Sequence, residues 1–239
     1  MNFANHQKTR TMAIKILNIQ SSASMDWSLT RKLSNAFLEN ISKQHKEVEI
    51  ETLDLVKTPP PYVSPEWISG AFSKTQLTQL EVSALSNSDE YIAQVEKASI
   101  ILIGAPMYNY GMPASLKAWF DQIARINKTF SFDLSRGDFP IEPILRDKVL
   151  VLMTSSGEFG FEKGGIREDS GHLVPHVQAC AHYLGVNAKT DFYHVGIEYQ
   201  EFKDQRHEAS KQQAFESIPA LVETILNKYF PVSLNQESN

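Results

Sequence analysis

Two short apolar segments, each ending abruptly at turn-forming residues, constrain the fold more than any other feature of this sequence. Residues 99–105 are rich in isoleucine and stop at Pro106, and residues 149–153 are rich in valine and leucine and stop at the polar run 154–157. Short, nearly unbroken apolar segments of this kind are typical of strands covered on both faces, as in parallel sheets flanked by helices. The chain is therefore expected to build an α/β core.

Strand and helix patterns alternate around these two segments. Residues 13–19 and 48–55 alternate apolar and polar side chains, as strands do, and the second has the composition of a half-buried edge strand. Residues 29–41 carry an apolar side chain at every fourth position, which predicts a helix face. Pro219 lies inside the last helical pattern and is expected to kink or divide it. Further elements are expected as helices at 113–126, 173–184 and 205–229 and as a strand at 186–195.

The order of these elements predicts a doubly wound parallel sheet of five strands with helices on both faces. The flavodoxin-like strand order 2-1-3-4-5 is expected, with a ligand site at the carboxyl ends of strands 1 and 3. Residues 12–230 are expected to form a single domain, and residues 1–11 and 231–239 to be loose tails. The proline-containing residues 56–88 are expected to be a long insertion that packs over the surface.

Composition narrows the class of protein. Of the 239 residues, 42% are hydrophobic, which is enough for one sizeable core. The net charge of −5 comes from interspersed charges of both signs, so no nucleic-acid partner is expected. No apolar run reaches about 18 residues, and the start lacks the apolar segment of a signal peptide, so no membrane association is expected. The single cysteine, Cys180, fits a reducing cytoplasmic location.

The first candidate loop, residues 21–30, joins the first strand to the first helix. Hydroxyls at Ser21, Ser28 and Thr30, together with the unpaired N–H groups of a helix start, suit a phosphate. The loop lacks the lysine of a GxxxxGK[ST] motif, which excludes a nucleotide-hydrolysing P-loop. Ser28 as a simple helix cap explains the same spacing equally well.

The second and third loops follow the two buried segments. Residues 106–113 offer two tyrosines and two methionines, which suit a flat aromatic ring, although such side chains also serve ordinary packing. Residues 154–160 contain small side chains and a glycine that let the backbone approach a ligand, or that simply form a flexible connection. His172, His176 and His182 have no acidic partner at matching spacing, so no metal site is expected.

Three motifs carry a resemblance to a known family. The segment Ala105–Tyr110 reads APMYNY, the following helix contains the pattern KAWFD at 117–121, and residues 129–132 read TFSF. Together with the loops, these resemble the FMN-dependent NADH-azoreductases, which belong to the flavodoxin-like NAD(P)H quinone reductases. The resemblance extends from about residue 13 to 227 and is most specific at residues 105–110.

The resemblance implies one FMN per subunit and a homodimer with the active site at the subunit interface. The FMN phosphate and the start of its ribityl chain would be bound by Ser21, Ser28, Leu29 and Thr30. The isoalloxazine ring would contact Pro106, Met107, Tyr108, Asn109 and Tyr110. Its pyrimidine end would lie near Ser155, Ser156 and Gly157.

The resemblance also implies an activity. NADH or NADPH would deliver a hydride to flavin N5, and a quinone or azo compound would then take it in a ping-pong sequence. Tyr108 or a water molecule is the candidate proton source, and no other catalytic side chain is nominated. An electron carrier of the same fold, without a substrate of its own, is the alternative. A hydrolase is excluded because no GxSxG motif is present.

The third loop departs from the family pattern. Many relatives have Ser-Arg-Gly-Gly there, whereas residues 155–158 of this chain are Ser-Ser-Gly-Glu. An arginine is missing and an acidic side chain, Glu158, stands nearby. The first loop also departs, because it has Ser28-Leu29-Thr30 where the family usually has Ser-x-Ser. The two departures leave the acceptor open, and the choice between NADH and NADPH stays open because no basic pocket for a 2′-phosphate is identifiable.

Overall fold

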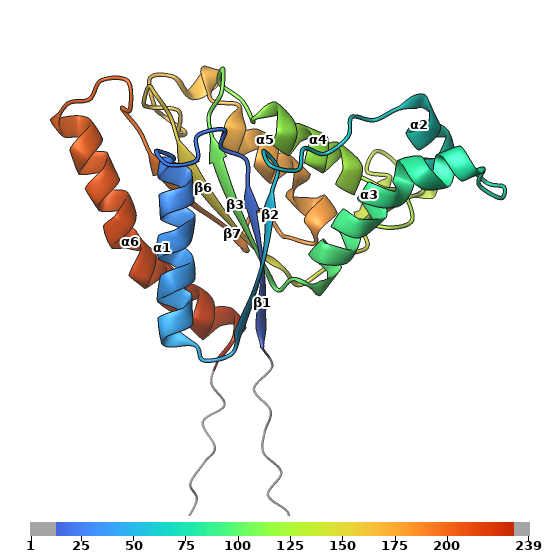
Figure 1. Ribbon diagram of the computed structural model, residues 1–239, viewed down its shortest axis with the longest axis horizontal. Coiled ribbons are helices and arrows are strands. Elements are labelled where there is room, and N and C mark those ends of the chain that lie inside the picture. Colours follow the sequence, from blue (N-terminus) through green and yellow to red (C-terminus); the bar gives the residue numbers. More distant parts are fainter. Residues whose placement is uncertain (1–12, 232–239) are drawn as a thin grey trace, which may run out of the picture.

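A computed structural model describes residues 13–231, and the predicted tails lie outside this range except for Pro231. Its centre is a parallel sheet of five strands in the order β2-β1-β3-β6-β7, which is the predicted order 2-1-3-4-5 (Figure 1). The strands are β1 (Ile14–Gln20), β2 (Val48–Asp54), β3 (Ile100–Pro106), β6 (Val149–Ser155) and β7 (Phe192–Ile197).

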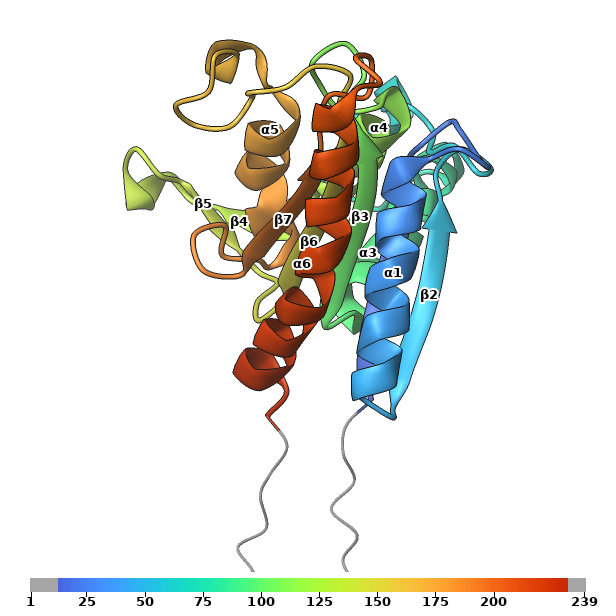
Figure 2. The same cartoon turned by 90° about the vertical axis from the view of Figure 1, so that its left-hand side faces the viewer.

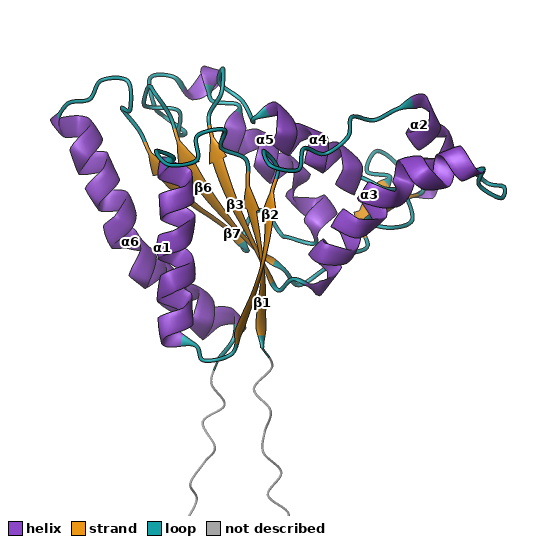
Figure 3. Cartoon of the chain, in the orientation of Figure 1, coloured by secondary structure: helices purple, strands orange, loops and turns teal. Residues whose placement is uncertain are grey.

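Helices cover both faces of the sheet, as predicted. Figures 2 and 3 show α1 and α6 side by side on one face and α3, α4 and α5 on the other. The helices are α1 (Leu29–Gln44), α2 (Pro65–Ala71), α3 (Gln79–Lys97), α4 (Ala114–Ile123), α5 (Leu173–Cys180) and α6 (Gln205–Tyr229). Short 3-10 turns lie at Leu134–Arg136, Glu168–Ser170 and Ala181–Leu184.

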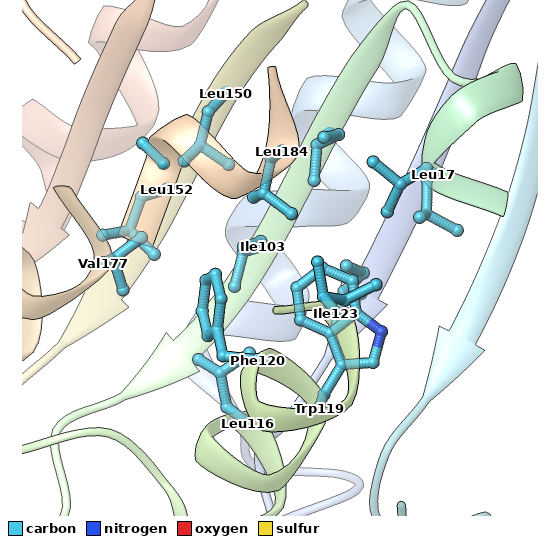
Figure 4. Close-up of a cluster of buried hydrophobic side chains, with 14 of the residues drawn as sticks. Leu17, Ile103, Leu116, Trp119, Phe120, Ile123, Leu150, Leu152, Val177 and Leu184 are labelled. Carbon is cyan, nitrogen blue, oxygen red and sulfur yellow. The ribbon is translucent and has the colours of Figure 1, made fainter. Parts of the chain in front are cut away.

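The two apolar segments form the centre of the core because both of their faces are buried. Alternate residues of β3 point to opposite sides: Ile101 and Ile103 pack toward α4, and Ile100 and Leu102 pack toward α1. Figure 4 shows Trp119 of α4, with its neighbours, covering the first of these faces. This two-sided burial explains why neither segment alternates with polar residues.

The insertion at 56–88 carries α2 and the beginning of α3. Trp67 of α2 is buried, and its indole Nε1 donates to Gln122 Oε1 of α4 at 2.7 Å. Thr78 and Glu81 form a capping box at the start of α3. The insertion is therefore anchored to the side of the α/β core by specific contacts, and Figure 1 shows α2 at its outer edge.

Residues 130–143 form a small antiparallel hairpin outside the main sheet. Its strands are β4 (Phe130–Phe132) and β5 (Ile141–Pro143), and Figure 2 shows the hairpin projecting from the molecule. Phe130 packs against Tyr183, with ring centroids 5.3 Å apart, whereas Phe132 is half exposed.

Four sequence-based expectations need correction. The helix predicted at 113–126 is α4, which ends at Ile123. The strand predicted at 186–195 begins only at Phe192, because residues 187–191 form a turn in which Asp191 N–H donates to the Asn187 carbonyl at 2.8 Å. The α-helix predicted at 173–184 ends at Cys180 and tightens into a 3-10 turn. Pro219 does not divide α6, which is continuous from Gln205 to Tyr229.

Among residues 13–231, no helix combines the length and the apolar character that crossing a bilayer requires.

Candidate functional site

The three candidate loops meet at one edge of the sheet, because parallel strands place all their carboxyl ends on the same side. Gln20 is paired with Gly104, and Pro106 with Ser155, so β1, β3 and β6 end close together (Figure 3). The loops 21–28, 107–113 and 156–171 follow these strands. This is the edge at which open α/β sheets bind their ligands.

The first loop presents buried hydroxyls beside a helix start. Ser28 is the N-cap of α1 and accepts from Arg31 N–H at 3.2 Å, while its Oγ lies 3.1 Å from Thr30 Oγ1. Leu29 is the first residue of that helix. Ser21 has a different surrounding: its backbone N–H and its hydroxyl both donate to the Gly104 carbonyl, at 3.0 and 2.9 Å. Ser21 thus also fixes the base of the loop to β3.

An ion pair that the sequence analysis missed connects this loop to the end of β2. The Arg31 guanidinium binds both carboxylate oxygens of Asp54, at 2.8 and 3.1 Å, and also donates to the Ser22 carbonyl at 2.9 Å. Burial by itself raises the pKa of Asp54, but the hydrogen bonds from Arg31 and from Val56 N–H, with the guanidinium charge, outweigh it and lower that pKa. An arginine in the first turn of a helix, with an aspartate ending the adjacent strand, was the available signal.

The second loop is a tight turn with two residues in the left-handed region. Tyr108 and Gly111 exchange two backbone hydrogen bonds, at 3.1 and 3.0 Å. Between them, Asn109 has φ 48° and Tyr110 has φ 68°. Asparagine tolerates this conformation, but for a bulky residue such as tyrosine it is strained and persists only where other contacts hold it.

Two further contacts attach the second loop to its neighbours. The Tyr108 hydroxyl accepts from Ala23 N–H of the first loop at 3.1 Å. Met107 N–H donates to the Ser155 carbonyl at the end of β6 at 2.8 Å. Pro106 is the last residue of β3, so the turn leaves the sheet at the predicted position.

The third loop is held by its carbonyl groups and leaves N–H groups free. The carbonyls of Ser156 and Gly157 accept from the N–H groups of Gln200 and Glu201, at 3.1 and 3.0 Å. A Cβ on Gly157 would lie 2.6 Å from Glu201 Cγ, so only glycine permits this approach without displacement. Within residues 13–231, no group accepts from the N–H of Gly157 or of Glu158.

Glu158 joins the second and third loops. Its Oε2 accepts from the Tyr110 hydroxyl and its Oε1 from Arg167 Nε, both at 3.0 Å. The hydrogen bond to the Glu158 carboxylate, followed by the charge of that carboxylate, raises the pKa of Tyr110. Positions 155–158 contain no arginine, but the guanidinium of Arg167 pairs with Glu158, a contact that the sequence analysis missed.

A cluster of aromatic rings and guanidinium groups supports the third loop. The Phe159 and Tyr199 rings are stacked, with centroids 4.3 Å apart and planes 17° from parallel. Arg167 lies 4.7 Å from the Phe159 centroid, and Arg206 lies beside the stack, 5.0 Å from the Tyr199 centroid and 5.6 Å from that of Phe159. Cation–π and stacking contacts of this kind make the loop a rigid wall of the site.

A pocket of about 720 Å³ adjoins the loops beside β7. Met107, Ser155 and Ser156 line one side of it. His194 lines another side, and its Nε2 lies 2.8 Å from Thr154 Oγ1. The remaining wall is largely apolar and comes from α5, α6 and residues 161–171. Among residues 13–231, no group of three or more His, Cys, Asp or Glu side chains is arranged to hold a metal ion.

The chemistry of this edge fits a phosphorylated ring compound such as FMN. Two free N–H groups, at Gly157 and Glu158, match the carbonyl and nitrogen acceptors of a flat heterocycle. The half-buried Met107 offers polarizable surface to such a ring. The start of the 16-residue helix α1, with its hydroxyls, offers donors to a phosphate.

Comparison with known proteins identifies the family. The model of the flavodoxin-like fold family matches residues 14–218. The chain is 47% identical to FMN-dependent NADH:quinone oxidoreductase 2 of Colwellia psychrerythraea, over 83% of this chain and 90% of that protein. It is 48% identical to the protein of the same name from Idiomarina loihiensis, over 78% and 77% of the two chains.

Solved structures agree on the fold. A Bacillus anthracis azoreductase superposes with a TM-score of 0.78 at 24% identity, covering 88% of this chain and 99% of the other. An FMN-dependent NADH-azoreductase from the same species, solved in complex with FMN, superposes with a TM-score of 0.75 at 19% identity, covering 90% and 99%. The chain therefore belongs to the flavodoxin-like family and, within it, to the FMN-dependent NADH:quinone oxidoreductases.

Proposed function

We propose that this protein is an FMN-dependent oxidoreductase that uses NADH or NADPH to reduce quinones or azo compounds. The observation that carries the proposal is the joining of three loops at the carboxyl edge of the sheet, with the N–H groups of Gly157 and Glu158 left free. The names of relatives at 47–48% identity support the same activity. When bound, FMN would supply hydride-transfer chemistry at N5 between NADH or NADPH and the acceptor, and the two substrates would use one place in turn.

The chain's own residues would bind and orient. The start of α1, with Ser21, Ser28, Leu29 and Thr30, would hold the phosphate and the start of the ribityl chain. The ring would lie against residues 106–110 (Pro106, Met107, Tyr108, Asn109, Tyr110). Ser155, Ser156 and Gly157 would face its pyrimidine end. Stacking the acceptor about 3–3.5 Å from the ring would be the main protein contribution to the rate.

Tyr108 is the one side chain proposed as a proton source, with water as the other candidate. Its hydroxyl accepts from Ala23 N–H, which leaves the phenolic proton available to a bound acceptor. The Tyr108→Phe variant distinguishes the two sources. Its turnover should fall if the tyrosine supplies the proton and should be retained if water does.

Flavin binding and turnover test the proposal directly. Purified protein incubated with FMN and freed of excess should absorb near 450 nm, which is a property of the flavin, and should consume NADH only when a quinone or azo acceptor is present. A protein that never takes up FMN overturns the proposal. Tight FMN binding without steady-state NADH consumption would instead favour the electron-carrier alternative.

We further propose a cytoplasmic homodimer with one FMN per subunit. The hairpin 130–143 and the adjoining Ile144 support a subunit interface, because they expose a group of large apolar side chains that a second copy would cover. These are Phe132, Leu134, Phe139, Ile141 and Ile144.

A further inference from the structure

The Tyr110–Glu158 contact is the side-chain hydrogen bond that connects the second and third loops. It pairs a hydroxyl donor with a carboxylate acceptor at 3.0 Å. Hydrogen bonds to charged acceptors are stronger than neutral ones. Glu158 lies next to Gly157, whose free N–H is proposed to face the flavin, so the contact stands at the rim of the site.

The two partners differ in how firmly they are held. Glu158 belongs to the wall that the Phe159–Tyr199 stack supports, and Arg167 fixes its second carboxylate oxygen. Tyr110 lies at the tip of a turn, is 47% exposed and has a φ of 68°. Glu158, the more firmly held residue, therefore positions Tyr110, whose backbone is strained.

Two weaker contacts assist at Tyr110. Its carbonyl accepts from His172 N–H at 2.9 Å, and its ring meets Phe161 edge-on with centroids 6.2 Å apart. Neither contact involves the hydroxyl. Among residues 13–231, Glu158 is the one hydrogen-bond partner of that hydroxyl, and its carboxylate also pairs with the charge of Arg167 beside the site.

We propose that Glu158 is a positioning residue: it holds Tyr110 across the mouth of the flavin site and so maintains the second loop in its binding-competent form. This inference rests on the proposed function, since the flavin ring is expected between these two loops. A loop that is competent for only part of the time weakens the apparent affinity in proportion to that fraction. Loss of the contact should therefore weaken FMN binding.

A double-mutant cycle on FMN binding tests the role. Tyr110→Phe removes only the hydroxyl, and the backbone strain is the same for phenylalanine. Tyr110→Phe and Glu158→Ala should each raise the FMN dissociation constant by about 3- to 10-fold, as expected for one solvent-accessible hydrogen bond to a charge. The FMN dissociation constant of the double variant should not exceed the larger of the two single-variant values, because both changes remove the same contact.

The binding is measured by titrating apoprotein into FMN and following the loss of flavin fluorescence. Tyr62→Phe and Glu39→Ala, which alter exposed residues away from the three loops, serve as matched controls and should bind as the wild type does. The melting temperature of each apoprotein should stay within about 2 °C of the wild type.

The outcomes are distinguishable. Wild-type protein that binds FMN, with both single variants at wild-type affinity, overturns the positioning role and leaves the proposed function intact. Additive losses in the double variant also overturn it, because independent effects do not come from one contact. Wild-type protein that does not bind FMN overturns the proposed function and this role with it.

Discussion

At the scale of single residues, the site depends on side chains that hold other groups in place. Arg31 ties the first loop to the end of β2, and Glu158 ties the second loop to the third. Both are charged and partly buried, and each has its charge matched by a neighbour at hydrogen-bond distance. Such arrangements reduce the reorganisation that a bound ligand would otherwise require.

The Asp54→Asn variant tests how much the Arg31–Asp54 ion pair contributes to stability. It leaves the largely buried guanidinium of Arg31 without its counter-charge and should lower the free energy of unfolding at neutral pH by about 2 kcal/mol, somewhat less than for a fully buried pair. The folded-state pKa of Asp54 is lowered, so its stabilising contribution is present above the unfolded-state value and is lost as pH falls through the folded-state value. Urea unfolding of the wild type and of Asp54→Asn is measured at pH 7 and near pH 3. If the difference in free energy of unfolding between the two proteins does not shrink in acid, the stabilising role of the Arg31–Asp54 ion pair is contradicted.

At the scale of elements, the helices differ in how well their sequences suit them. Helix α3 begins with a complete capping box, and α1 with a serine cap, so both starts are locally encoded. Helix α6 contains Pro219 in its interior and stays continuous. Four buried residues hold it against the sheet and α1, namely Ala214, Ile218, Val222 and Ile225. Tertiary packing therefore outweighs a local penalty in α6.

Removing that penalty should stabilise the protein. Pro219 is exposed, so Pro219→Ala restores a backbone donor without disturbing the core. A proline in a helix interior costs about 3 kcal/mol relative to alanine, and the looser unfolded chain offsets roughly 1 kcal/mol. We expect a gain of about 1–2 kcal/mol in urea unfolding. Pro65→Ala is the control, because Pro65 lies in the first turn of α2, where proline is favourable, and a gain there but not at Pro219 would refute the explanation.

At the scale of the whole molecule, two layers of helices bury the sheet and leave the hairpin 130–143 outside it (Figure 2). Phe139 is 85% exposed and Leu134 is 74% exposed, so the hairpin's tip lacks cover within the described chain. Apolar side chains concentrated in one projecting element are characteristic of a contact surface. The proposed homodimer gives this surface an occupant.

The Phe139→Asp variant tests the dimer. A charge in the buried centre of an interface costs several kcal/mol, so the variant should shift the wild-type dimer toward monomer at micromolar concentration. Light scattering after size-exclusion chromatography reports the mass. Leu80→Asp places the same charge on another exposed apolar residue, in α3, and should leave the dimer intact. A monomeric wild type, or an unaltered dimer in Phe139→Asp, would reject the proposed interface.

The fold class, the strand order and the edge on which the loops gather could all be predicted from the amino-acid sequence. Burial on two faces leaves a direct record in β3 and β6, and parallel strands then bring their carboxyl ends together without further information. The prediction that the last strand starts at residue 186 was wrong. Val186 is apolar because it is buried in the loop before the strand, and the turn that begins at Asn187 delays the strand.

The pairing of side chains across the loops could not be predicted in this way, because it depends on the three-dimensional arrangement of the loops. Glu158 meets Tyr110 and Arg167, and Arg31 meets Asp54, although 48, 9 and 23 positions separate the partners. Periodic patterns report whether a position is buried, but a hydrogen bond depends on the path of two loops in space, which sheet register and packing set. For the same reason, the sequence showed only that residues 155–158 contain no arginine, whereas the structure shows that Arg167 pairs with the acidic side chain of Glu158.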